Sequence, residues 1–112
     1  MHIKQLLKLW EGGTRANEIH INIPVALPLD HVARILALEE MYPGHAREQI
    51  IIDLLEVALD ELEEAFPYVK GERVIREDEF GDPVYEDIGK TPRFLAIAHK
   101  YREQLQAEHK LD

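Results

Sequence analysis

Two His–Glu pairs in this chain have the spacing that metal binding on a helix would use. His45 and Glu48 lie three residues apart, and His99 and Glu103 lie four apart, so each pair would present two ligands on one helix face. A structural metal site needs about four ligands, and no third ligand in the sequence is spaced to join either pair. We therefore expect no metal site and no cofactor.

Nucleophilic catalysis has few candidate residues. The chain contains no cysteine and no serine, and its two threonines are Thr14 and Thr91. Each threonine is typical of a turn or a helix cap. Covalent catalysis needs a nucleophile, a base that activates it and groups that stabilise an anion, and no such set is visible in the sequence. We expect a protein that is not an enzyme.

Acidic residues dominate the charge of the chain. Its formal net charge is −9, and residues 18–66 carry eleven acidic residues against two basic ones. Such a surface repels polyanions, because nucleic-acid affinity rests largely on phosphates neutralised by Lys and Arg. The polar residues Gln49, Asp53, Glu56, Asp60 and Glu63 or Glu64 form one stripe at helical spacing. This stripe could bind divalent cations, but we interpret it as a solvated face. DNA binding is expected to be weak or absent at neutral pH.

Residues 20–27, HINIPVAL, have the alternation of a strand with one buried face. Ile21, Ile23, Val25 and Leu27 would point one way, and His20, Asn22, Pro24 and Ala26 the other. A strand needs a partner, and helical patterns follow at once over residues 29–42 and 46–66. The second of these is apolar on most of its circumference, so it needs more neighbours than one short helix and one strand can supply. A second copy of the chain would supply them.

This strand–helix–helix pattern, carried by INIPVALPLDHVARILALEEMYPGHAREQIIIDLLEVAL, resembles the ribbon-helix-helix superfamily over roughly residues 19–66. The resemblance implies a mainly α fold with a short β-ribbon, in which the strand pairs antiparallel with the same strand of a second subunit and the helices intertwine. The implied dimer core is formed by Ile21, Ile23, Val25, Leu27, Ile51, Leu54, Leu55, Ala58 and Leu62.

The family resemblance also implies a DNA-binding face. Where the family binds DNA, outward ribbon residues read bases and the N-terminus of the second helix contacts phosphate. The ribbon positions here are His20, Asn22, Pro24 and Ala26, of which Asn22 alone is a good base reader. The candidate anion site at the helix N-terminus consists of His45 and Arg47.

The flanking segments complete the predicted organisation. Residues 1–17 are predicted to form an amphipathic helix followed by a linker, and one face of the helix carries Ile3, Leu6, Leu7 and Trp10. Residues 18–67 form the core. Residues 68–112 form an acidic hairpin or arm and a last helix that begins at Thr91. The hairpin prediction rests on two β-prone patches around Gly81.

Trp10 could bind a partner or a membrane surface, although we favour docking on the core. The acidic, aromatic arm could recognise a basic partner or pack on its own domain. Its candidate partner residues are Asp78, Glu79, Phe80, Asp82 and Tyr85.

The whole chain also resembles small bacterial proteins labelled type 1 pili tip component or pilin assembly protein, through MYPG, LDELEEAFPYVKG and DEFGDPVYEDIGKTPRFL. That label implies a pilus-related role. A pilus tip subunit is exported and usually disulfide-bonded, whereas this chain has no cysteine and its N-terminal residues do not have the pattern of a secretory signal. No run approaches the ~20 apolar residues of a membrane helix, so we expect a cytoplasmic protein.

Two functional classes remain after these exclusions. The first is a homodimeric interaction or adaptor protein, whose partners are a second copy of itself and a protein of unknown identity. The alternative is a DNA-binding transcriptional regulator of the ribbon-helix-helix class. The acidic charge favours the first.

Overall fold

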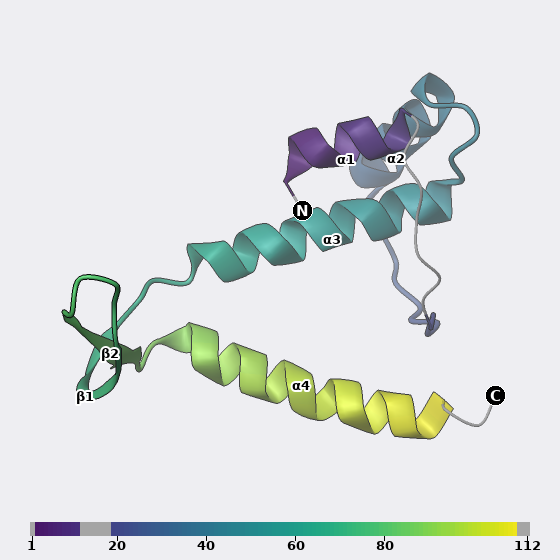
Figure 1. Cartoon of the computed structure of the whole chain (residues 1–112). Helices are drawn as coiled ribbons and strands as arrows, with labels where there is room; N and C mark the ends of the chain where they lie inside the picture. Colours follow the sequence, from purple (N-terminus) through teal and green to yellow (C-terminus); the bar gives the residue numbers. More distant parts are fainter. Residues whose placement is uncertain (1, 12–18, 110–112) are drawn as a thin grey trace. The chain divides into compact units, whose positions relative to one another are not determined.

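The computed structural model describes residues 2–11 and 19–109 and divides the chain into two compact units (Figure 1). The first unit, Met1–Leu62, contains the helices α1 (Ile3–Trp10) and α2 (Leu29–Met41) and most of α3 (Arg47–Ala65). The second unit, Glu63–Asp112, contains the strands β1 (Lys70–Glu77) and β2 (Pro83–Asp87) and the helix α4 (Lys90–His109). The protein is therefore mainly helical with a small antiparallel sheet.

The core of the first unit lies between α1 and α3. Its buried side chains are Leu6 and Trp10 from α1 and Ile50 and Val57 from α3. The amphipathic spacing of the first helix predicted this docking, since a short helix gains most of its stability from a packed apolar face. At its start, the backbone N–H of His2 donates to the side chain of Gln5 at 2.8 Å, as in a capping box. The predicted linker, residues 12–17, lies outside the described residues.

Helix α2 agrees with the helix predicted over residues 29–42 to within one residue, and it lies between two prolines. Pro28 occupies the N-cap position with Asp30 in the first turn, and the helix stops before Pro43, which disfavours helical geometry at Tyr42. Gly44 then turns the chain with φ of +98°. No residue of this helix is buried within one chain: Leu29 is 86% exposed and Met41 is 67% exposed.

Residues 19–28 form neither a helix nor a strand, and all of them are exposed. The predicted strand over residues 20–27 is thus not found in the single chain. The physical reason is that a strand exists through ladder hydrogen bonds to a neighbour, and the sheet in the described part of the chain contains β1 and β2 alone. Pairing with a second copy stays a prediction.

The predicted hairpin is confirmed in the second unit. Strands β1 and β2 pair antiparallel, with Val74 opposite Tyr85 and Glu77 opposite Pro83. The turn contains Gly81, whose φ of +82° lies in the region that glycine adopts without steric cost. The two register shifts in this ladder lie between Lys70 and Arg76.

Helix α4 runs for 20 residues and contains no buried residue. It begins at Lys90, one residue before the predicted N-cap Thr91. Phe94 in its first turns contacts Phe66 edge to face, with 5.5 Å between the ring centroids. In the described residues, no helix combines the length and the apolar character that crossing a membrane would require.

Candidate functional site

An open apolar groove lies between α2 and α3 in the first unit. It has a cavity volume of about 510 Å³ and is lined by Leu27, His31, Arg34, Ile35, Leu38, Ile51, Leu54, Leu55 and Ala58. Seven of these nine residues are apolar, and His31 and Arg34 supply the polar groups. Five of the predicted dimer-core residues meet here: Leu27, Ile51, Leu54, Leu55 and Ala58. The predicted dimer core therefore supplies five of the nine residues that line the groove.

The remaining predicted core residues are exposed in the single chain. Ile23 is 76% exposed, Val25 68% and Leu62 49%, and Ile21 is exposed as well. No residue of α2 is buried. A soluble monomer rarely leaves so many neighbouring aliphatic side chains in water, and a large patch of this kind usually marks an interface.

The predicted ribbon surface is exposed along its whole length. His20, Asn22, Pro24 and Ala26 all lie in the segment that precedes α2. Because their apolar neighbours are exposed too, the single chain does not separate an inner from an outer face of this segment. A second strand would be needed to make that distinction.

The candidate anion site at the N-terminus of α3 is filled by a carboxylate of the same chain. Glu39 accepts three hydrogen bonds from Arg47: from the backbone N–H at 3.0 Å, from Nε at 3.3 Å and from Nη2 at 3.0 Å. The hydrogen bonds from the Arg47 side chain lower the pKa of Glu39 below its usual value of 4.5, and Glu39 in turn raises the pKa of Arg47. A phosphate would use the same backbone N–H and the same guanidinium fork.

His45, the other predicted member of the anion site, is also engaged within the chain. Its Nε2 donates to the backbone carbonyl of Trp10 at 2.5 Å. This bond ties the turn before α3 to the last residue of α1. In the structure His45 therefore bonds to Trp10, whereas Arg47 bonds to Glu39.

The indole of Trp10 bonds to α3 itself. Its Nε1 donates to Oδ2 of Asp53 at 2.6 Å, and Gln49 donates to Oδ1 of the same carboxylate at 2.9 Å. Asp53 is 2% exposed, so its assignment to a solvated stripe was wrong. The signal in the sequence was Trp10 itself, because a buried indole N–H needs an acceptor. The burial of Trp10 also excludes its role as an exposed partner or membrane anchor in this fold.

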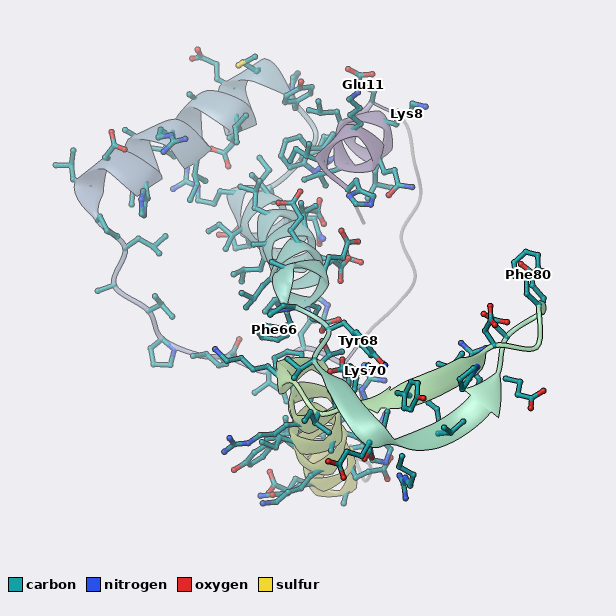
Figure 2. All side chains as sticks on the ribbon, turned by 90° about the vertical axis from the view of Figure 1, so that its left-hand side faces the viewer. Lys8, Glu11, Phe66, Tyr68, Lys70 and Phe80 are labelled. Atoms are coloured by element: carbon teal, nitrogen blue, oxygen red, sulfur yellow. The ribbon has the colours of Figure 1, made fainter. Side chains whose placement is uncertain are left out.

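The acidic arm ends in a hairpin tip that several hydrogen bonds hold together. The Asp78 carboxylate accepts the backbone N–H groups of Phe80 and Asp82, both at 2.9 Å, and the backbone of Asp78 bonds to both Gly81 and Asp82. Phe80 is 81% exposed and lies at the far end of the hairpin, as Figure 2 shows. Asp78 thus holds the turn, while Glu79 and Phe80 are left to face solvent or a partner.

Tyr85 does not share that position. It lies on β2, where its ring is covered by Nζ of Lys70 at 4.1 Å and its backbone carbonyl accepts the hydroxyl of Tyr68 at 2.8 Å. Of the five predicted arm residues, the structure therefore separates Tyr85 from the tip.

The described histidines are not grouped with enough other ligands to bind a metal ion. In residues 2–11 and 19–109, no three His, Asp or Glu side chains are grouped so that they could hold a metal ion. His99 and Glu103 lie 3.9 Å apart as an exposed pair on α4.

Comparison with known proteins assigns no relationship: no protein-family model matches the chain, and no curated protein or solved structure matches it significantly.

Proposed function

We propose that this chain is a non-enzymatic interaction protein that works as a homodimer, built on a ribbon-helix-helix-like core. The observation that carries the proposal is the apolar surface that one chain leaves open in its first unit. The surface comprises the groove between α2 and α3, the exposed face of α2 and the aliphatic residues 21–27. A second copy has the same surface, and an isologous dimer buries both at once.

The energy available from this burial is large compared with the stability of a small protein. Fully burying one Val, Leu or Ile side chain contributes about 1.5–3 kcal/mol, whereas a folded domain is typically stable by about 5–15 kcal/mol. Ile23 and Val25 are 76% and 68% exposed, so burying them in a dimer would add most of that free energy. Pairing residues 20–27 with their counterparts would also satisfy backbone groups that a single strand leaves to water.

The hairpin is the surface that we assign to a protein partner. Phe80 projects from a turn that its own hydrogen bonds hold rigid, so little entropy is lost when the tip is bound. The charges around it, Glu77, Glu79 and Asp82, favour a partner with a basic rim around an apolar pocket.

The hydrogen bonds and the charge of the chain disfavour the DNA-binding alternative. The backbone N–H and guanidinium that a phosphate would use are bonded to Glu39, and a dimer would double the formal charge of −9. Affinity for DNA depends on phosphate contacts and their released counterions, and both observations argue against such contacts.

A matched pair of substitutions tests the dimer. Ile23→Asp places a charge on the face that the proposal buries, whereas Asn22→Asp places the same charge one residue away on the opposite face. We expect Ile23→Asp to dissociate or unfold the protein and Asn22→Asp to leave the dimer intact, because an unpaired buried charge costs several kcal/mol. Sedimentation velocity and far-UV circular dichroism report both effects. Equal behaviour of the two variants would contradict the proposed pairing of residues 20–27.

A further inference from the structure

Helix α2 is held to the core of the first unit through its C-terminal half. The residues at this end that pack against the core are Ile35, Leu38 and, directly after the helix, Tyr42. Residues 29–34, by contrast, are all exposed, and so are residues 19–28 before them. The groove runs along both halves of the helix, because His31 and Arg34 line it together with residues of the anchored half. The width of the groove therefore depends on the angle at which α2 leaves its anchored end.

The corner between α2 and α3, residues 42–46, is the point about which this angle would change. The ring of Tyr42 lies against that of Trp10, with 5.4 Å between the ring centroids, and His45 bonds to the backbone carbonyl of Trp10. These contacts fix the corner on α1. Across the corner, Glu39 of α2 accepts three hydrogen bonds from Arg47 of α3. The pair thus links the two helices that form the walls of the groove.

Each charge of this pair lies at the unfavourable end of its own helix. Glu39 is in the last turn of α2, where the helix dipole favours cations, and Arg47 is the first residue of α3, where the dipole favours anions. With the helices as they stand, the Glu39 carboxylate accepts a backbone N–H at the start of α3 that has no partner within that helix. If α2 swung away, both charges would keep only the unfavourable ends. The pair therefore favours one angle between the helices, which an exposed pair within one helix, such as Asp30–Arg34, cannot do.

We infer that α2 is a lid on the groove, that it pivots at residues 42–46, and that the Glu39–Arg47 pair is the latch that holds it at the angle which a second copy binds. The inference rests on the proposed dimer and adds its regulation. When the latch opens, the α2 wall of the groove separates from the α3 wall, and the surface that two copies share loses its shape. Both copies must be latched to pair. A fall in the latched fraction from nearly all molecules to about a third to a half therefore raises the dimer Kd about four- to ninefold.

The distance between two spin labels in the full chain tests the lid, since the chain has no native cysteine. Ala33→Cys labels α2 and Glu56→Cys labels α3; both positions are exposed and neither lines the groove. Excess unlabelled chain, added before refolding, keeps the measured distances within one chain. We expect double electron–electron resonance to give one narrow distance distribution when the latch is intact.

Three substitutions in the labelled chain then separate the latch from its surroundings. Glu39→Ala removes the acceptor of all three hydrogen bonds and should broaden the distribution. Arg47→Ala keeps the backbone N–H and should broaden it less. Glu40→Ala is the matched control, because Glu40 is the exposed neighbour of Glu39 in the same turn of α2, and it should leave the distribution narrow. An unchanged distribution in Glu39→Ala would overturn the lid and its latch.

Sedimentation equilibrium of the same variants without labels tests the regulation. We expect Glu39→Ala to raise the dimer Kd about four- to ninefold and Glu40→Ala to leave it unchanged. Far-UV circular dichroism shows whether each variant is folded, and Arg47→Ala carries the test if Glu39→Ala unfolds. A broadened distance distribution with an unchanged Kd would overturn the regulation and keep the lid. A wild type that sediments as a monomer would overturn the proposed dimer and its regulation, while the spin-label distances decide the lid separately.

Discussion

Trp10 is bound to α3 through its indole and to His45, in the turn before α3, through its backbone carbonyl. The indole donates to Asp53, which is buried and also accepts from Gln49. Hydrogen bonds to a charged, buried acceptor contribute more than neutral ones, because the carboxylate has lost its water. This pair therefore fixes α1 on α3 more specifically than apolar contact would.

We expect Trp10→Phe to lower the free energy of unfolding by about 1–3 kcal/mol, since phenylalanine keeps an apolar ring but cannot donate. Urea unfolding followed by circular dichroism measures the loss. Asp53→Ala serves as the second corner of a double-mutant cycle with Trp10→Phe, because alanine has no side-chain acceptor. A coupling energy close to zero between the two substitutions would show that the hydrogen bond does not stabilise the fold.

The Glu39–Arg47 pair predicts a defined pH dependence. Hydrogen bonding from Arg47 lowers the pKa of Glu39 from its usual value of 4.5, so the folded protein binds the Glu39 proton more weakly than the unfolded chain does. The resulting stabilisation is fully present above that usual value and is lost as the pH falls through the lowered pKa. We expect the difference in urea midpoint between wild type and Glu39→Gln to be largest near neutral pH and to shrink in acid. A difference that does not change with pH would contradict this account.

At the scale of elements, the hairpin turn depends on one side chain. Asp78 accepts two backbone N–H groups, those of Phe80 and Asp82, which the turn would otherwise leave to water. We expect Asp78→Ala to weaken the tip by about 1–2 kcal/mol, which corresponds to about 5- to 30-fold faster amide exchange at residues 80 and 82. Glu79→Ala is the control, because Glu79 is an exposed residue of the same tip. Equal exchange in both variants would show that Asp78 does not hold the turn.

Local signals predicted the helices and the hairpin because each signal acts within a few residues. Pro28, Pro43 and Gly81 fix backbone geometry wherever they occur, and the spacing of apolar residues sets the period of each helix. The buried Asp53 and the Glu39–Arg47 pair could not be read in the same way. Each joins elements whose approach is decided by tertiary packing, over separations of 43 and 8 residues. The predicted strand over residues 20–27 is absent for a different reason: the alternation of a strand is present in the sequence, but the described residues of the chain offer it no strand to pair with.

At the scale of the whole molecule, the two units differ in what they leave exposed. The first unit exposes aliphatic side chains along α2, α3 and residues 21–27, which suits a permanent interface between copies. The second unit also exposes apolar side chains along its strands and α4, and in addition a charged hairpin tip that carries Phe80. That tip suits a smaller and more polar contact with another protein. The proposed function assigns self-association to the first surface and partner binding to the second.

Sedimentation equilibrium of the unmodified full chain tests the central claim most directly. The chain has a mass of 13.0 kDa, so the proposed dimer has twice that mass. We predict that a single species of the dimer mass persists at micromolar concentration in about 150 mM salt, because the interface is apolar and salt does not screen it. A stable, folded species of 13.0 kDa under the same conditions would contradict the dimer, and with it the assignment of the open groove and residues 20–27 to a second copy.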